Sequence, residues 1–177
     1  MKSRAGADRL ASMFNTPALS STRFVIPDGK QGIFDTVNLM IDIVNKYKTN
    51  LVIRGLALSL VEFLPNKDER GEVETIFSWV QNHIRYVKDV HGVETVSTPD
   101  KTLEVMQGDC DDQSLLLACL LESIGHPTSF KIAGYNGDDF EHVYCVVFVQ
   151  DEAIHMDATE SEPIGWEPPD STISAYL

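Results

Sequence analysis

The sequence contains few cysteines and no long apolar run. Only three cysteines occur among 177 residues, at positions 110, 119 and 145, and none of them form a close pair. This pattern does not fit the disulfide framework of a small secreted domain and favours a reducing compartment. No apolar stretch approaches the roughly 18 residues that a membrane helix requires. We therefore expect a globular protein without structural disulfides or a membrane span.

Basic residues are also scarce: 14 Lys and Arg stand against 27 Asp and Glu, which gives a formal net charge of −13. Such a surface repels phosphate backbones and anionic lipids, so neither nucleic acid nor a membrane is expected as a partner. The basic start, Met1-Lys2-Ser3-Arg4, is not followed by an apolar stretch of signal-peptide length. The sequence therefore predicts a cytoplasmic protein with no export signal.

The length suits one domain that buries its core without metal or disulfide staples. Residues 1–30 mix Ser, Thr, Pro and Gly and are interpreted as an N-terminal arm or tail, and residues 31–160 as the folded domain. Residues 161–177 are expected to form an extended C-terminal segment, because Pro168 and Pro169 cannot donate hydrogen bonds to a sheet. Either terminus offers a surface for a protein partner.

Apolar periodicity predicts helices in the first two thirds of the chain. The first expected helix begins at Gly32, the next two span about 51–64 and 68–87, and a single helical turn is expected at 102–106. A buried helix is expected to run from Cys110 to a stop at Gly125 and Pro127. Beyond Pro127 the period changes to that of strands, with candidates around 130–135, 143–149 and 153–159 and a turn at 136–139. Helices followed by a small antiparallel sheet predict an α+β fold.

Cys110 stands out because it lies where core meets solvent. A turn at Gly108 and Asp109 is expected to place it in the first turn of a helix that is apolar on nearly every side from Leu115 to Leu121. Free N–H groups and the dipole at a helix start lower the pKa of a thiol. The acidic side chains at 109, 111 and 112 oppose this, so a thiolate would need a nearby imidazolium. The alternative is a small, inert filler cysteine, as Cys119 and Cys145 are expected to be.

His142 is the best candidate base among five histidines, because it begins a strand directly after an acidic turn. A thiol–imidazole pair needs a third group that orients the ring, and Asp157 on the following strand can supply it. The two side chains oppose each other directly if paired residue numbers add to 299. A turn near 150–152 predicts a slightly larger value. Any odd value keeps both side chains on one face, where a diagonal contact suffices.

These residues resemble the transglutaminase-like core of papain-type thiol enzymes over roughly residues 68–160. The matching pieces are Ile76-Phe77-Ser78-Trp79-Val80, Ile84-Arg85-Tyr86, Gly108-Asp109-Cys110-Asp111-Asp112, Leu120-Leu121-Glu122-Ser123-Ile124-Gly125-His126-Pro127, His142 and Asp157-Ala158-Thr159. The resemblance implies a papain-like fold with an N-terminal helical part, a buried helix that bears the cysteine and a small antiparallel sheet. The chain departs from many members in having Val143-Tyr144 after the histidine, where they place an aromatic pair.

By this resemblance Cys110 is the nucleophile, His142 the base and acid, and Asp157 the orienting carboxylate. It implies a cysteine enzyme that acts on a peptide or protein amide through a thioester, with hydrolysis by a protease or amidase favoured over cross-linking. Gln107 and Tyr86 are candidate oxyanion donors beside the backbone N–H of Cys110. No cofactor is expected.

Two other interpretations remain open. The first is a catalytically silent module of the same fold that serves in binding or assembly. The Cys-Asp-Asp variant and the Trp-Glu-Pro-Pro tail resemble small transglutaminase-like proteins of tailed bacteriophages and prophages, which implies the host cytoplasm or a virion. The second is a zinc site built from His126, His142, His155, Asp157 and Cys110. No Cys-x-x-Cys or His-Glu-x-x-His spacing supports zinc, and neither acidic turn has the spaced pattern of a calcium loop, so no metal is expected.

Overall fold

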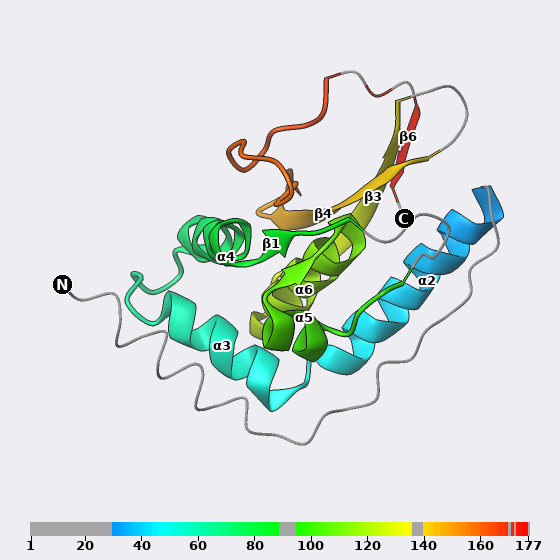
Figure 1. Cartoon of the computed structure of the whole chain (residues 1–177). Coiled ribbons are helices and arrows are strands. Elements are labelled where there is room, and N and C mark those ends of the chain that lie inside the picture. The colour runs from blue at the N-terminus through cyan, green and yellow to red at the C-terminus, as the bar shows by residue number, and fades with distance from the viewer. Residues whose placement is uncertain (1–29, 89–94, 136–139, 170, 172, 177) are drawn as a thin grey trace.

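The computed structural model describes residues 30–177 except 89–94, 136–139, 170, 172 and 177. Its described part combines helices α2 to α6 with a small antiparallel sheet, which confirms the predicted α+β class (Figure 1). The N-terminal arm as far as residue 29, His91 and the expected turn at 136–139 lie outside the described residues. None of the described helices is long and apolar enough to cross a membrane.

The predicted helices are present, and the structure corrects several of their ends. They are α2 (Lys30–Tyr47), α3 (Leu51–Val61), α4 (Glu69–His83) and α5 (Pro99–Val105). Asn50 caps the start of helix α3, because its side chain accepts hydrogen bonds from the N–H groups of Val52 and Ile53. It ends at Val61 rather than at residue 64, and Phe63 beyond it is 88% exposed.

Helix α4 is shorter than the expected span of 68–87. Its backbone becomes extended at Ile84, with φ −94° and ψ 110°, so the chain leaves the helix and forms strand β1 (Arg85–Tyr86). Ile84 continues the apolar periodicity and is buried, but it packs from extended backbone. Periodicity alone does not reveal such a change of backbone conformation, because a buried residue is apolar in a helix and in extended backbone alike.

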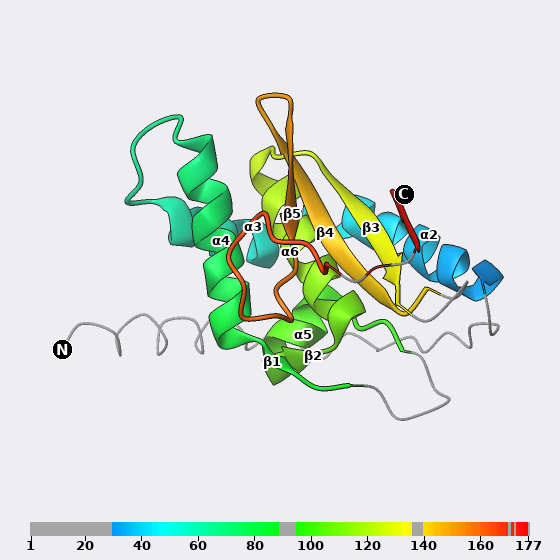
Figure 2. The same ribbon diagram turned by 90° about the horizontal axis from the view of Figure 1, so that it is seen from above.

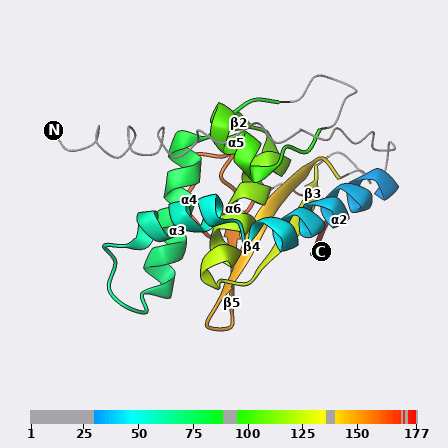
Figure 3. The same cartoon turned by 90° about the horizontal axis from the view of Figure 1, so that it is seen from below.

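Helix α6 (Cys110–Ile124) lies at the centre of the molecule, as the apolar run from Leu115 to Leu121 predicts. The side chain of Asp109 caps its start, and Gly125 ends it in the left-handed region at φ 108°. The sheet covers one side of α6, and α2 and α3 lie on the opposite side (Figures 2 and 3). The core is therefore built around this helix, which is buried except near its two ends.

The main sheet has the strand order β5-β4-β3-β6 and is antiparallel throughout. Strands β3 (Thr128–Gly134), β4 (His142–Val149) and β5 (Glu152–Met156) are the three expected from the sequence. Strand β6 (Ile173–Tyr176) pairs with β3 and was not predicted, because the expected extended segment at 161–177 was inferred from its prolines. The prolines precede β6, so they do not prevent its pairing.

A second, two-stranded sheet corrects the expected turn at Gly108 and Asp109. Strand β2 (Gln107–Gly108) pairs in parallel with β1, so that Tyr86 lies opposite Gly108. A Cβ atom on Gly108 would lie 2.5 Å from the Cβ atom of Asp112, so a side chain has no room here. Since Tyr86 pairs with Gly108 and Gly108 approaches Asp112 closely, Tyr86 lies beside the start of α6.

The burial of α6 predicts a large difference between two leucine substitutions. Leu117 on α6 is fully buried, whereas Leu58 on α3 is 46% exposed. Leu117→Ala should lower the free energy of unfolding by about 2–5 kcal/mol, and Leu58→Ala by no more than about 0.5 kcal/mol. Urea unfolding followed by circular dichroism measures both. Equal losses would contradict a core organised around α6.

Candidate active site

His142 and Asp157 meet across the pair of strands β4 and β5. The paired residues of these strands have numbers that add to 301, as in Cys145 opposite Met156, which is slightly above 299 as predicted. The sum is odd, which is the condition for both side chains to lie on one face. His142 and Asp157 are therefore diagonal neighbours on one face. His142 Nε2 lies 2.6 Å from Asp157 Oδ2, and the carboxylate is 1% exposed.

The surroundings of Asp157 keep its side chain ionised. Burial raises the pKa of Asp157, but hydrogen bonds from His142 and Thr159 outweigh burial and hold the pKa below its ordinary value. The backbone N–H and the hydroxyl of Thr159 both donate to Oδ1, at 3.1 and 2.6 Å. An ionised carboxylate only accepts hydrogen bonds, so His142 Nε2 must carry the shared proton. In the neutral imidazole, Nδ1 is then left as the basic nitrogen.

The sulfur of Cys110 faces the same end of β4. Cys110 is the first residue of α6, and its sulfur lies within hydrogen-bond reach of the backbone of Val143, the residue after His142. The thiol also donates to Asp111 Oδ1 at 3.5 Å. The tertiary structure thus brings the thiol to the residue that follows the candidate base.

The pKa of Cys110 differs from the sequence-based expectation. Burial raises the pKa of this thiol well above its ordinary value, and the charges of Asp111 and Asp109 raise it further, whereas the backbone of Val143 lowers it. The stabilisation expected from a helix start is outweighed by burial and by the acidic first turn. The free thiol is therefore protonated at neutral pH. Cys119 and Cys145 are fully buried, as expected of filler residues.

Two tyrosines interact electrostatically with groups of the site. Burial raises the pKa of Tyr86, and the charges of Cys110 and Asp157 add to this effect. Burial, followed by the charges of Asp157, Glu160 and Cys110, raises the pKa of Tyr135 to about 12. The ring centroid of Tyr135 lies 6.5 Å from that of His142. The sequence indicates Tyr86 but not Tyr135, which it places only at the end of the strand expected around 130–135.

The two candidate oxyanion donors lie on the small parallel sheet. Gln107 is on β2, and its Oε1 atom accepts a hydrogen bond from Arg85 at 2.7 Å. Tyr86 is on β1, is 47% exposed and feels the charge of Cys110. Of the two, Tyr86 is the side chain that the structure links electrostatically to the thiol.

The remaining groups of the zinc interpretation are drawn apart by other partners. His126 follows the end of α6, and its Nε2 atom lies 2.7 Å from Glu72 on α4. His155 Nδ1 lies 2.9 Å from Glu167. Within the described residues, no group of three or more His, Cys, Asp and Glu side chains is arranged to hold a metal ion.

The C-terminal segment packs against the sheet behind His142. Glu167 forms an ion pair with Lys131 and accepts a hydrogen bond from the hydroxyl of Tyr144 at 3.1 Å. The ring of Tyr144 lies 5.8 Å from that of His142. Residues 157–169 cross the sheet face that points away from α6 (Figure 2). Glu167 therefore anchors this segment to the strands that carry the histidine.

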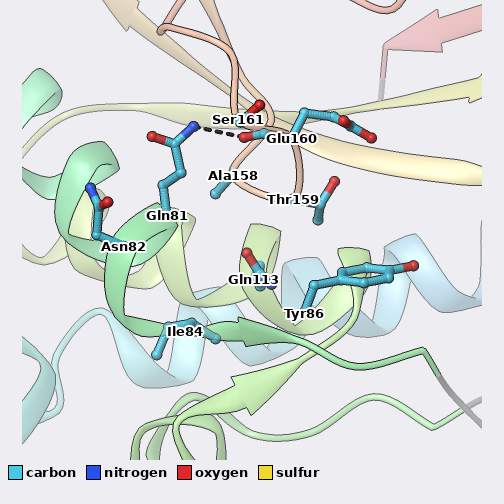
Figure 4. Close-up of a pocket in the computed structure, with 9 residues that line it drawn as sticks. All are labelled: Gln81, Asn82, Ile84, Tyr86, Gln113, Ala158, Thr159, Glu160 and Ser161. Atoms are coloured by element: carbon cyan, nitrogen blue, oxygen red, sulfur yellow. Dashed lines mark hydrogen bonds between the residues drawn. The ribbon is translucent and has the colours of Figure 1, made fainter.

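A pocket of about 300 Å³ opens beside the site, between the end of α4 and the loop that follows Asp157 (Figure 4). It is lined by Gln81, Asn82, Ile84, Tyr86, Gln113, Ala158, Thr159, Glu160 and Ser161. Gln113 was not singled out from the sequence, although it lies three residues after Cys110 and so shares its helix face.

A model of the transglutaminase-like superfamily matches residues 59–166, which is more than half of the chain. No curated protein sequence matches. Among solved structures, a provisionally named protease of Parabacteroides distasonis has a TM-score of 0.59 and 15% identity, over 84% of this chain and 32% of that chain. A provisionally named cysteine protease of Cytophaga hutchinsonii has a TM-score of 0.52 and 18% identity, over 82% of this chain and 53% of that chain.

LapG of Legionella pneumophila has a TM-score of 0.50 and 18% identity, over 76% of this chain and 80% of that chain. The chain spans about half the length of the Cytophaga protein and about a third of the Parabacteroides protein. The structural similarity shows a shared fold, and at identities this low it shows the fold alone.

The buried hydrogen bond between His142 and Asp157 predicts a pH-dependent loss of stability in Asp157→Asn. The variant should lose about 1–3 kcal/mol of unfolding free energy at pH 7, because it weakens three hydrogen bonds to one buried carboxylate. A depressed pKa stabilises the fold above the ordinary carboxyl pKa of about 3.9 and stops doing so as pH falls through the folded value. The difference from the parent should therefore shrink below about pH 4.

Urea unfolding at several pH values measures this difference. Asp42→Asn, at an exposed position on α2, is the matched control and should change stability by no more than about 0.5 kcal/mol. A loss in Asp157→Asn that is the same at pH 3.5 and pH 7 would contradict the assignment.

The contact between Cys110 and Asp111 predicts that Asp111→Asn lowers the pKa of the thiol. The charge of Asp111 opposes the thiolate, so removing it should move the pH midpoint of iodoacetamide alkylation downward. Mass spectrometry of the alkylated Cys110 peptide reports the rate at each pH. Glu104→Gln, which removes the same charge at an exposed position on α5, should leave the midpoint unchanged. An upward or absent shift in Asp111→Asn counts against this interpretation.

Proposed function

Because the chain belongs to the transglutaminase-like superfamily, we propose that it is a thiol enzyme in which Cys110, His142 and Asp157 act on an amide through a thioester. Members of this superfamily are commonly cysteine enzymes. The observation that carries the proposal is the buried hydrogen bond of 2.6 Å between His142 and Asp157. His142 begins strand β4, and the backbone of the next residue, Val143, contacts the sulfur of Cys110. A buried acceptor that orients an imidazole next to a thiol is the arrangement that nucleophilic catalysis needs.

In the proposed reaction the thiol is activated when substrate binds. His142 Nδ1 takes the proton of Cys110 as the sulfur attacks the amide carbonyl carbon. The backbone N–H of Cys110, at the start of α6, stabilises the negative charge on the carbonyl oxygen. The C–N bond then breaks, the imidazolium gives its proton to the departing amine, and the acyl group stays on sulfur as a thioester.

The acyl group is then transferred from sulfur to an acceptor, which breaks the C–S bond. Water yields a carboxylic acid and regenerates the thiol, as in a protease or amidase. A second amine yields a new amide, as in cross-linking. We propose hydrolysis of a peptide or protein amide as the activity.

A second candidate is a catalytically silent binding or assembly module of the same fold. The observation that favours it is the protonated thiol: burial and two neighbouring carboxylates hold the pKa of Cys110 high. A residue retained only for packing has no need of a low pKa.

An activated ester separates these two candidates. p-Nitrophenyl acetate should acetylate Cys110 of the full chain, and mass spectrometry should place the acetyl group on that residue. His142→Ala should slow acetylation by about 100-fold or more, because it removes the general base. His83→Ala, at an exposed histidine on α4, is the matched control and should react like the parent.

The decay of the acetyl-enzyme distinguishes the two acceptors. Hydrolysis predicts that added methylamine leaves the decay rate unchanged, whereas an admitted amine accelerates it and yields N-methylacetamide. Equal acetylation rates in the two histidine variants would instead support the silent module.

A further inference from the structure

The pocket beside the site contains a buried acceptor that nothing in the described residues satisfies. Gln113 is 1% exposed, and its Nε2 atom donates to the backbone oxygen of Gly108 at 3.3 Å. Its Oε1 atom is buried and has no hydrogen-bond partner among the described residues. Figure 4 shows this oxygen directed from the floor of the pocket toward the loop 158–161. Buried acceptors are almost always paired, so an oxygen left in this state beside a cavity points to a ligand that donates.

The other side-chain amides of the pocket also have their nitrogen atoms engaged. Gln81 Nε2 donates to the backbone oxygens of Glu160 and Glu162 at 2.7 and 2.8 Å. Asn82 Nδ2 donates to the backbone oxygen of Ser78 at 2.6 Å. Gln81 uses both of its N–H groups, whereas Asn82 and Gln113 use one each, and in all three amides the oxygen remains to accept a hydrogen bond from a ligand. The pocket is therefore rich in acceptors.

The hydroxyl of Thr159 completes this pattern, because it donates to Asp157 Oδ1 at 2.6 Å. A ligand that brings several N–H donors fits such a lining, whereas a carboxylate or phosphate would meet oxygen atoms of its own kind.

The electrostatic field at the pocket has the sign that attracts a cation. Beyond the effect of burial, the carboxylate charges of Asp109, Asp111 and Asp157 all raise the pKa of Tyr86, which lines the pocket. Glu160 adds a carboxylate at the rim, and the chain as a whole carries a formal charge of −13. A cationic group gains from this field and a neutral group of equal shape does not.

We propose that this pocket is a subsite for the cationic side chain of a protein substrate, arginine or lysine, and that Gln113 Oε1 accepts a hydrogen bond from an N–H group of that side chain. Gln113 lies one helical turn after Cys110, and the loop 158–161 directly follows Asp157, so the pocket adjoins the reacting centre. A volume of about 300 Å³ is at the lower end for ligand sites and suits a single side chain. The five donors of a guanidinium match several separate acceptors better than one ammonium does.

The identity of the occupant as a substrate residue rests on the proposed function, whereas the preference for a cation does not. Binding is therefore measured in the full chain carrying Cys110→Ala, which cannot form a thioester. Butylguanidinium is titrated against N-butylurea, its neutral near-isostere, and amide chemical shifts report the binding. Butylguanidinium should bind about tenfold more tightly, because a charged donor strengthens each hydrogen bond. N-acetylarginine amide should bind at least as tightly, since the proposed occupant belongs to a peptide chain.

Substitutions at the acceptors locate the effect. Gln113→Leu should weaken butylguanidinium binding about tenfold, and Gln113→Glu, which replaces the amide with a carboxylate, should strengthen it. Since Gln113 is buried, Asn82→Ala provides a second variant at an exposed position. It should weaken binding severalfold, whereas Asn45→Ala, on the exposed face of α2, should not.

Equal affinities for butylguanidinium and N-butylurea, or parent-like binding in both Gln113→Leu and Asn82→Ala, would overturn the cation subsite. Much weaker binding of N-acetylarginine amide than of butylguanidinium would overturn the assignment to a protein side chain. Failure of p-nitrophenyl acetate to acetylate Cys110 removes the proposed catalysis but leaves the binding result intact, so the two failures are distinguishable.

Discussion

The structure depends on the burial of one helix by the sheet and the other helices. Helix α6 is covered by the sheet on one side and by α2 and α3 on the other, so its position is fixed by packing along almost its whole length. Its first turn reaches the surface at Cys110 and Asp111, and it is capped by Asp109 and held against the small sheet at Gly108. A residue at that point combines a rigid backbone with access to solvent. The candidate nucleophile occupies this position.

The second constraint is the register of β4 and β5. A shift of a single residue would turn either His142 or Asp157 to the other face of the sheet, because side chains alternate along a strand. The core residues of both strands resist such a shift, since Cys145, Val147 and Ile154 are buried against the core. Hydrophobic packing on one face therefore maintains a hydrogen bond on the other. The C-terminal segment adds a further support, because Glu167 ties it to Tyr144 beside the histidine.

The charges around the site act in two directions. Burial, together with the charges of Asp111 and Asp109, raises the pKa of Cys110 and disfavours a resting thiolate. The same negative field favours a cation in the neighbouring pocket, where the amide oxygens also require donors. A substrate cation bound there would in turn offset the carboxylates that oppose the thiolate. The acidic first turn is thus compatible with a thiol that becomes reactive only when the pocket is filled.

Much of the architecture follows from local sequence patterns. The 3.6-residue period predicted the helices, and the Gly-His-Pro stop after Ile124 predicted the end of α6. Alternation predicted β3, β4 and β5, and the turn near residue 150 predicted that paired residue numbers add to slightly more than 299. These features succeed because each depends on neighbours within a few residues. The ends of α3 and α4 and the strand β6 were missed, because they depend on contacts between distant segments.

The sequence by itself determined which residue types could do chemistry, and that His142 and Asp157 lie on one face of the sheet if the strand register is odd, because side chains alternate along a strand. Only the tertiary structure decided how those groups behave. It placed the thiol against Val143 and two carboxylates, raised its pKa, and added Tyr135 to the site. It also left Gln113 Oε1 beside a cavity without a hydrogen-bond partner in the part of the chain that the structure describes, which no local pattern records. The pKa of a group and the satisfaction of a hydrogen bond depend on everything within a few ångströms, and that neighbourhood exists only once the chain is folded.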